Sequence, residues 1–303
     1  MAANSIKSLS VSLLSVILSL LIGAIIIGIS GSDPAQAFWA LFSGAFGDTA
    51  SLARTFEKAT PLIFNGLAIA FAHKAGLFNI GAQGQFLFAA IAAAAAGYLI
   101  HGIPFYIHAP LVLLTGALAG GIYSAIQGAL KAYTGAHEVI TGIMFNYVAI
   151  NITDYLAKGP LMDTYQGNIV PRTPLILESC RLPHLFELPS GFFISVFISV
   201  LCWWFVKYSV KGFEIRVSGS NIHAARYAGI NTRAIVIFTM LVSGIMAGLG
   251  GAVETTGIVF RYQPGFNTGL GFEGITIALL ARIHPFGIVP AACLIGAMKS
   301  GAA

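Results

Sequence analysis

Long apolar stretches alternate along this chain with short polar ones, and this pattern predicts a series of membrane-spanning helices. A spanning helix needs about 20 mostly apolar residues, because each residue advances the helix by about 1.5 Å. Nine stretches with few or no charges meet or approach this requirement. The second and the eighth are short, so we expect tilted or broken helices there. The predicted spans cover residues 10–29, 60–72, 81–100, 109–130, 138–156, 191–206, 234–255, 271–281 and 286–301.

The first apolar stretch has an alternative interpretation as a secretory signal peptide. Lys7, the apolar run and the sequence Ala35-Gln36-Ala37 together resemble such a peptide and its cleavage site. However, a signal core usually has about 7–15 residues, and this run has about 20. We therefore interpret the stretch as a span and keep cleavage as the alternative.

Composition agrees with a membrane protein and excludes most soluble classes. Hydrophobic residues make up 57% of the 303 residues, charged residues 9%, and the mean hydropathy is +0.84. A typical soluble protein has about 25% charged residues. The predicted fold class is an all-α, polytopic membrane helix bundle, and residues 1–303 form one transmembrane domain. The lipid bilayer is the expected surrounding, and no nucleic-acid partner is expected.

The distribution of positive charge predicts the orientation. With the N-terminus inside, nine Lys and Arg side chains face the cytoplasm and seven face outside. The segment 207–233 has five of them and one acid, Glu214, whereas 158–190 has equal numbers of each sign. Cytoplasmic loops are enriched in Lys and Arg. The sequence thus predicts a cytoplasmic N-terminus, a cytoplasmic loop at 207–233 and an extracytoplasmic loop at 158–190.

Glycine is abundant, with 35 residues, and two groups of glycines have helical spacing. Gly116 and Gly120 lie in the fourth predicted span, and Gly244 and Gly248 in the seventh. Small residues four apart let two helix backbones approach closely in lipid. We predict that these four glycines lie in helix contacts; the alternative is that glycine is simply common in membrane helices.

Polar uncharged side chains gather at two places in the apolar sequence. Residues 76–85 contain three glycines together with Asn79, Gln83 and Gln85, which predicts a non-helical break. The fifth span contains Asn146 and Asn151, and a buried amide in lipid is costly unless it has a partner. These five amides are candidate contacts for a polar, uncharged solute. The alternative at both places is hydrogen bonding between helices.

No enzyme motif is present. The chain has no phosphate-binding loop, no HExxH zinc motif and no GxSxG nucleophile motif. The three cysteines and seven histidines lack ligand spacing, so we expect no metal and no cofactor on this chain. The energy of active transport would then come from an ion gradient or from a partner that hydrolyses nucleotide.

The basic loop contains a short helix signal. Residues 211–219 lead to Asn221, a favourable N-cap, then about two helical turns follow over 222–228, and Gly229 ends them. Such a helix between two spans is suited to docking a soluble subunit. The alternative is a solvated loop.

The same loop resembles the coupling loop of ATP-binding cassette importer permeases, in the branch that serves ribose, other simple sugars, nucleosides and branched-chain amino acids. Segments 59–68, 75–85 and 271–282 are similar to other parts of that family. Segment 138–151 looks most like the permeases of nucleoside importers, which work with a lipoprotein substrate-binding protein. The coupling residues that the resemblance implies are Lys211, Glu214, Arg216, Asn221, Ala225, Arg226 and Gly229.

The resemblance implies a permease subunit without catalysis, in the bacterial inner membrane, that admits a nucleoside or a simple sugar. ATP and Mg²⁺ would be bound by a partner ATPase. The other implied partners are a sister permease or a second copy and the extracytoplasmic binding protein. Val217 and Gln83 depart from the family pattern, in which small and acidic residues respectively are common there. A tenth span is expected to be missing at the C-terminus.

Two other functions are compatible with the residues themselves. One is a secondary transporter that couples to ions through Glu138, Asp154 or Glu254. The other is a membrane subunit without a transport pathway, such as an inactive truncated copy.

Overall fold

The computed structural model describes residues 18–19, 21–265 and 269–302, and most of this part of the chain is helical. A helix over Leu21–Ile29 comes first. Two short strands, paired antiparallel with His184 opposite Pro189, form the only sheet of the described residues. The further elements are α2 (Pro34–Phe46), α3 (Thr49–Lys74), α4 (Ala82–Leu99), α5 (Phe105–Thr134), α6 (Glu138–Lys158), η1 (Tyr165–Gly167), η2 (Glu178–Cys180), β1 (His184–Leu185), β2 (Leu188–Pro189), α7 (Ser190–Tyr208), α8 (Val210–Ser220), α9 (Ile222–Tyr227), α10 (Thr232–Glu254), the π-helical turn η3 (Thr255–Val259), α11 (Leu270–Leu280) and α12 (Pro285–Gly301).

The prediction of an all-α polytopic membrane protein is confirmed. Each predicted span from the second to the ninth coincides with a helix, and in the described residues α4, α5, α6, α7 and the helix from Thr232 to Val259 are long and apolar enough to cross a membrane. The first predicted span lies partly outside the described residues. Its described part, Leu21–Ile29, is bent by 117° from α2.

Two local expectations were wrong, and one helix was not predicted. The second span is not short, because α3 has 26 residues and continues through Pro61. Residues 211–219 are not a lead-in loop, because they lie in α8, which Ser209 caps by accepting a hydrogen bond from the Gly212 amide at 2.8 Å. Helix α2 was not expected at all. It begins at Pro34 after the N-cap Asp33, a combination typical of helix starts.

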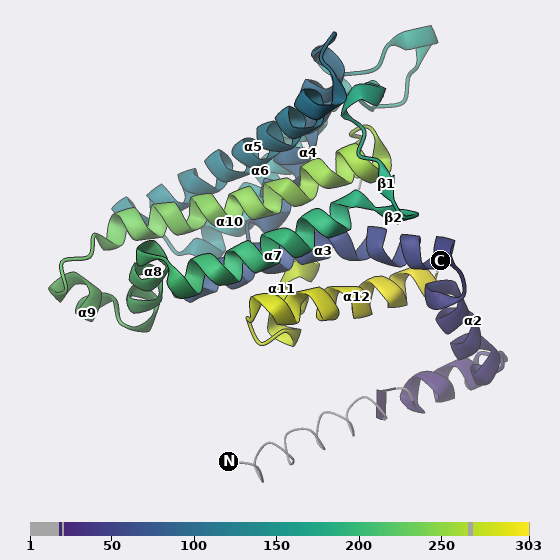
Figure 1. The fold of residues 1–303 in the computed structure, drawn as a ribbon, viewed down its shortest axis with the longest axis horizontal. Helices are drawn as coiled ribbons and strands as arrows, with labels where there is room; N and C mark the ends of the chain where they lie inside the picture. The colour runs from purple at the N-terminus through teal and green to yellow at the C-terminus, as the bar shows by residue number, and fades with distance from the viewer. Residues whose placement is uncertain (1–17, 20, 266–268, 303) are drawn as a thin grey trace.

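Helix α10 lies at the centre of the bundle. It packs most extensively against α5, and also against α3 and α4. The long helices lie side by side along the longest axis of the molecule (Figure 1). Their buried faces carry small and aliphatic residues, so that the core is continuous from α3 through α10 to α12.

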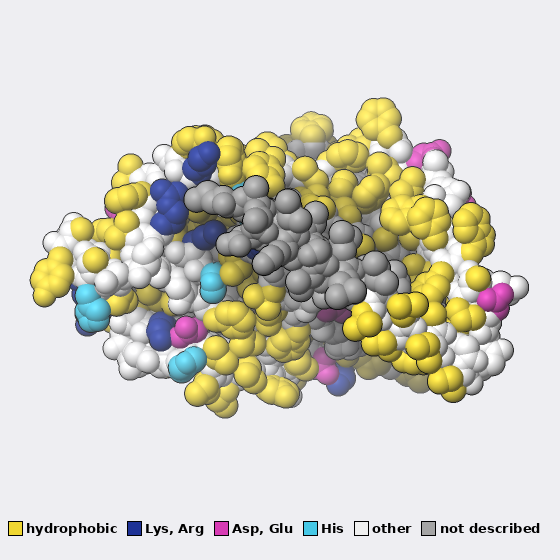
Figure 2. Space-filling view, turned by 90° about the horizontal axis from the view of Figure 1, so that it is seen from below, with side chains coloured by type: hydrophobic (Ala, Val, Ile, Leu, Met, Phe, Trp, Pro, Cys, Tyr) yellow, Lys and Arg dark blue, Asp and Glu magenta, His cyan; other side chains and the backbone are white. Residues whose placement is uncertain are grey.

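The two loops with contrasting charge lie at opposite ends of this bundle. Helices α8 and α9 extend from one end, and the hairpin β1–β2 lies at the other (Figure 1). Lys and Arg side chains gather toward the α8–α9 end, while hydrophobic side chains cover much of the opposite end of the face in Figure 2. This separation matches the charge asymmetry that the sequence shows between 207–233 and 158–190.

Glycines bring α5 and α10 into close contact. A Cβ atom on Gly120 would lie 2.7 Å from the Gly244 carbonyl oxygen and 2.8 Å from the Gly248 Cα. A Cβ atom on Gly248 would lie 2.7 Å from the Gly116 carbonyl oxygen. These neighbours are backbone atoms, which cannot move aside without separating the helices. The four glycines singled out in the sequence therefore face one another across a single interface.

Candidate functional site

The chain leaves helical geometry between α3 and α4, as the glycines of this segment predict. Helix α3 ends at Lys74, Gly76 adopts φ +72°, and α4 starts only at Ala82. The φ of Gly76 is unfavourable for residues with a Cβ atom. A Cβ atom there would also meet the backbone of Gly219, 3.4 Å away at the end of α8. The break in the membrane helices and the basic segment 207–233 are thus in direct contact.

The polar side chains of this break point into the bundle and bond to one another. Asn79 and Gln85 form two reciprocal amide hydrogen bonds, of 2.9 and 3.0 Å. Asn79 Nδ2 also donates to the Ser243 hydroxyl at 2.7 Å, and that hydroxyl donates to the Ala68 carbonyl at 2.6 Å. Both amide side chains are at most 1% exposed. This cluster ties α3, α4 and α10 together.

A second pair of contacts extends the cluster to α6 and α11. Asn146 accepts a hydrogen bond from the Gly84 amide at 2.8 Å and donates to the Ile80 carbonyl at 3.0 Å. Gln83 Oε1 accepts from the Gly271 amide at 2.7 Å, at the start of α11. Asn146 and Gln83 are also buried. We call this set, Asn79, Gln83, Gln85, Asn146 and Ser243, the amide layer.

The structure therefore unites four of the five predicted pathway amides and leaves the fifth apart. Asn151 lies on the exposed side of α6, and its side chain donates to the Tyr147 carbonyl of its own helix at 2.8 Å. The other four amides are each buried with protein partners, as the alternative of hydrogen bonding between helices expects. Sequence reasoning missed Ser243, although a polar residue in the middle of an apolar span was the available signal.

The predicted coupling residues mostly have structural partners in α8 and α9 or in the adjoining ends of α7 and α10. Lys211 pairs with Glu214 at 2.8 Å. The Arg216 guanidinium donates to the carbonyls of Val206 and Lys207 at the end of α7, where a cation is favourable.

Helix α9 has the expected boundaries. Asn221 caps it by accepting from the amides of His223 and Ala224, and Gly229 follows it with φ +78°. Arg226 Nε donates to Thr232 at 3.3 Å, and Ala225 is buried. The exposed side chains of α9 that sequence reasoning missed are Ile222, His223 and Tyr227, and Tyr227 is 95% exposed.

The carboxylates considered for ion coupling differ in their surroundings. Glu138 pairs with Lys131 at 2.8 Å, and Asp154 pairs with Lys158 at 3.1 Å one turn away. Glu254 is buried beside a cavity of about 310 Å³ between α3, α10, α11 and α12. Within the described residues, no group of three His, Cys, Asp or Glu side chains has the geometry of a metal site.

The end of the bundle opposite α8 and α9 has a broad basic recess of about 720 Å³. Arg172 and Arg261 line it together with Asp163, and Arg172 lies 3.7 Å from that carboxylate. Burial lowers the pKa of the Arg261 guanidinium, and the positive charge of Arg172 adds to this effect. Two cations thus share one acid at this end.

Comparison with known proteins gives consistent matches along the chain. The family described as "Branched-chain amino acid transport system / permease component" matches residues 51–303. The guanosine ABC transporter permease NupP of Bacillus subtilis is 41% identical over 98% of this chain and 86% of its own length. The nucleoside permease NupB of Lactococcus lactis is 33% identical, over 99% and 85%. The glucose permease TsgB13 of Haloferax volcanii is also 33% identical, over 89% and 73%. No solved structure matches the chain.

Proposed function

Because this chain belongs to the permease family of branched-chain amino acid transport systems, we propose that it is the membrane subunit through which an ATP-binding cassette importer admits a nucleoside. The observation that carries the choice of solute is the similarity to the guanosine permease, which extends along nearly the whole chain. A simple sugar is the second candidate, because a glucose permease is also similar. Ion coupling is not supported, since the relatives named above are ABC permeases and two of the three carboxylates considered lie in ion pairs.

The partner ATPase, which binds ATP and Mg²⁺, docks on α9. This helix extends from the bundle at the basic end, which we assign to the cytoplasm together with the N-terminus. Its exposed side chains, Ile222, His223 and Tyr227, offer an apolar and aromatic contact surface. Lys211, Glu214, Arg216 and Asn221 hold α8 and α9 in shape, so their role in coupling is to transmit force.

Force from the ATPase reaches the amide layer through α8. The end of α8 at Gly219 contacts the chain at Gly76, and Asn79 follows three residues later. A displacement of α8 therefore moves the break, and with it the hydrogen bonds between Asn79, Gln85 and Ser243. We infer that the amide layer is the closed barrier of the pathway and that its amides bond the hydroxyls or base edges of the solute when it opens.

The remaining partners fit surfaces at the other sides of the bundle. The extracytoplasmic binding protein docks at the recess of Arg172 and Arg261, whose excess positive charge suits an acidic partner surface. A sister permease or second copy covers α6, because Asn151 and Tyr147 are exposed there in the middle of a span. A polar side chain at that depth normally faces a protein or a water-filled cavity. The assembly would lie in the bacterial cytoplasmic membrane.

Uptake measurements test this function. The chain, expressed with the ATPase, sister permease and binding protein of its own gene neighbourhood, should accumulate labelled guanosine in a host without nucleoside uptake. Unlabelled nucleosides should compete, whereas glucose and leucine should not. Competition by glucose alone would replace the nucleoside with a sugar, and accumulation that survives ATP depletion would reject the ATP-driven importer.

A matched pair of variants tests the pathway. Gln83→Ala removes the acceptor of the Gly271 amide, whereas Gln83→Glu keeps an acceptor at the same reach. We expect Gln83→Ala to reduce uptake and Gln83→Glu to retain most of it, with equal amounts of assembled complex. Normal uptake by Gln83→Ala would remove the amide layer from the pathway.

A further inference from the structure

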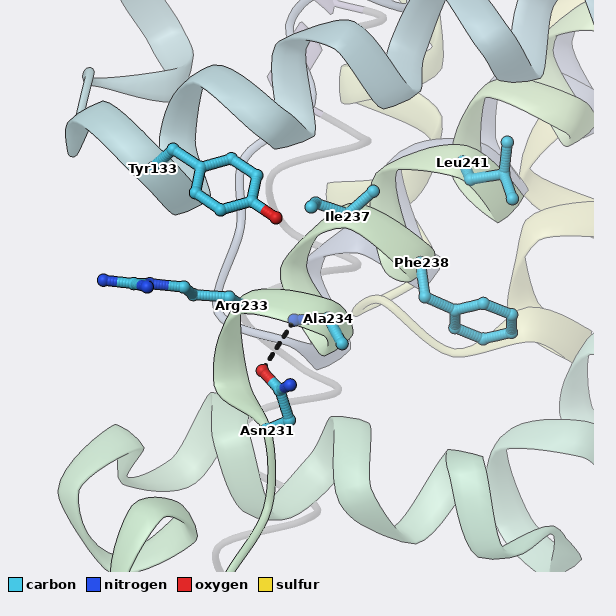
Figure 3. A pocket seen from close by; sticks show the side chains of 7 residues that line it. All are labelled: Tyr133, Asn231, Arg233, Ala234, Ile237, Phe238 and Leu241. Carbon is cyan, nitrogen blue, oxygen red and sulfur yellow. Dashed lines mark hydrogen bonds between the residues drawn. The ribbon is translucent and has the colours of Figure 1, made fainter.

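A groove opens at the basic end of the bundle, between the last turn of α5 and the first turns of α10. Its volume is about 560 Å³. Tyr133 lines one side, and the other side follows α10 from Arg233 to Leu241. In Figure 3 the Tyr133 hydroxyl points toward Ile237, and Arg233 extends beneath the tyrosine ring. The proposed transport function does not use this groove.

The end of the groove nearest α9 carries a positive charge, that of Arg233, without a carboxylate partner. Arg233 lies 5.8 Å from the centre of the Tyr133 ring, and within the described residues no acid lies within ion-pair distance of it. The nearby Lys131 is already paired with Glu138. Arg233 also lies in the first turn of α10, where the helix dipole disfavours a cation. Helix stability therefore does not explain this arginine, and an external anion would.

The inner end of the groove is apolar. Ile237, Phe238 and Leu241 line it, and all three are only partly buried. The eight residue steps from Arg233 to Leu241 advance α10 by about 12 Å toward the middle of the bilayer. A ligand that fills the whole groove must be anionic at one end and apolar over roughly this length.

We propose that this groove binds an anionic phospholipid of the cytoplasmic leaflet. The phosphate lies against the Arg233 guanidinium and the Tyr133 hydroxyl, and an acyl chain follows Ile237, Phe238 and Leu241. Basic pockets between membrane helices at the cytoplasmic side suit anionic headgroups in this way. Because Arg233 lies six residues after Tyr227, the bound lipid would hold the connection between α9 and α10 at the membrane surface.

Native mass spectrometry of the purified full-length chain in detergent tests this site. Phosphatidylglycerol is titrated against the wild type, Arg233→Gln, Ile237→Trp and the control Lys211→Gln, which removes a charge from α8 at the same end. We expect one bound phosphatidylglycerol, with an affinity reduced about fivefold by Arg233→Gln and unchanged by Lys211→Gln. Ile237→Trp fills the apolar wall without changing charge and should also weaken binding.

Several outcomes would overturn the proposal. Equal binding of phosphatidylglycerol to the wild type and Arg233→Gln would remove the headgroup contact. Equal affinity for phosphatidylcholine would show an apolar groove without charge selection, and displacement by millimolar inorganic phosphate would show a simple anion site. If Arg233→Gln loses the ATPase from the assembled complex but keeps phosphatidylglycerol, the groove is part of the ATPase interface. Size-exclusion profiles matching the wild type would show that each variant is folded.

Discussion

The amide layer predicts a measurable coupling between Asn79 and Gln85. Their side chains share two hydrogen bonds, of 2.9 and 3.0 Å, and both are buried. A side-chain hydrogen bond between membrane helices contributes about 0.6 kcal/mol on average, with a maximum of about 1.7 kcal/mol. The free energy of unfolding should therefore show a coupling of about 1 kcal/mol in a double-mutant cycle of Asn79→Ala and Gln85→Ala. Asn79→Ala alone should cost about 2 kcal/mol, because it also loses the bond to Ser243.

The assay is reversible unfolding of the purified chain in mixed detergent micelles, followed by circular dichroism. Asn79→Ala combined with Asn151→Ala provides the matched control, because Asn151 bonds only to its own helix and is exposed. That pair should be additive within about 0.3–0.5 kcal/mol. If the Asn79–Gln85 pair is equally additive, the two amides do not bond in the folded chain. The barrier that we infer would then have to be assigned to other residues.

Three further predictions concern packing, coupling and pH. Gly120→Leu should lower Tm clearly, because a Cβ atom at this position would lie 2.7 Å from the backbone of α10. In the control Gly257→Ala the new Cβ atom would have only ordinary contacts, so Tm should change by less than about 2 °C in a thermal-shift assay. Equal Tm values for the two variants would reject the close approach of α5 and α10. Tyr227→Ala should leave the stability of the permease unchanged but reduce the ATPase recovered with it on co-purification, and full recovery would move the docking surface away from α9. The hydroxyl and backbone amide of Ser51 hold the pKa of Asp48, the N-cap of α3, below its ordinary value. Its stabilising contribution is thus complete above about pH 4 and is lost as pH falls through the lowered pKa, so the Tm difference between the wild type and Asp48→Ala should shrink on acidification below about pH 4.

The sequence predicts the spans well where apolar character alone decides them, and less well where packing does. Residues 49–59 of α3 include Arg54, Glu57 and Lys58, so hydropathy assigns them to a loop. In the structure they extend the helix, because Asp48 caps it and Ser51 and Thr55 lie on a buried face. The cap was visible in the sequence, but the buried face depends on packing against α2, which was not predicted, and against α12, which is distant along the chain.

Helix α8 was missed for a related reason. It contains Gly212 and Gly219, which lower helix propensity and favour the interpretation as a loop. Both glycines are required by contacts that only the fold reveals, with the end of α7 for Gly212 and with the end of α3 for Gly219. The amide layer shows the same limit. Its residue types were predicted from their polarity, but the pairing of Asn79 with Ser243 joins residues 164 positions apart.

The starts of α4 and α11 indicate where the bundle opens. At the start of each helix the sequence contains a glycine, one further residue, a side chain with an acceptor oxygen and a second glycine. This places Gln83 and Glu273 in the first turn of their helices. There the helix dipole favours an acceptor, whether amide or carboxylate. Gln83 accepts from the backbone of α11, whereas Glu273 forms an ion pair of 2.6 Å with Lys299 of α12.

These two interactions tie α11 to its neighbours α4 and α12 with unequal strength. An ion pair and direct packing join α11 to α12, and α3 packs extensively against both of them. Direct contact between α11 and α4 is about as large as that between α11 and α12, but α3 packs little against α4, and the bond from Gly271 to Gln83 is a neutral one. Neutral hydrogen bonds are weaker than those of charged groups. We therefore infer that α11 and α12 move as a unit and that transport opens the junction of α4 and α11, beside the amide layer, which is the place where α8 can act through Gly76.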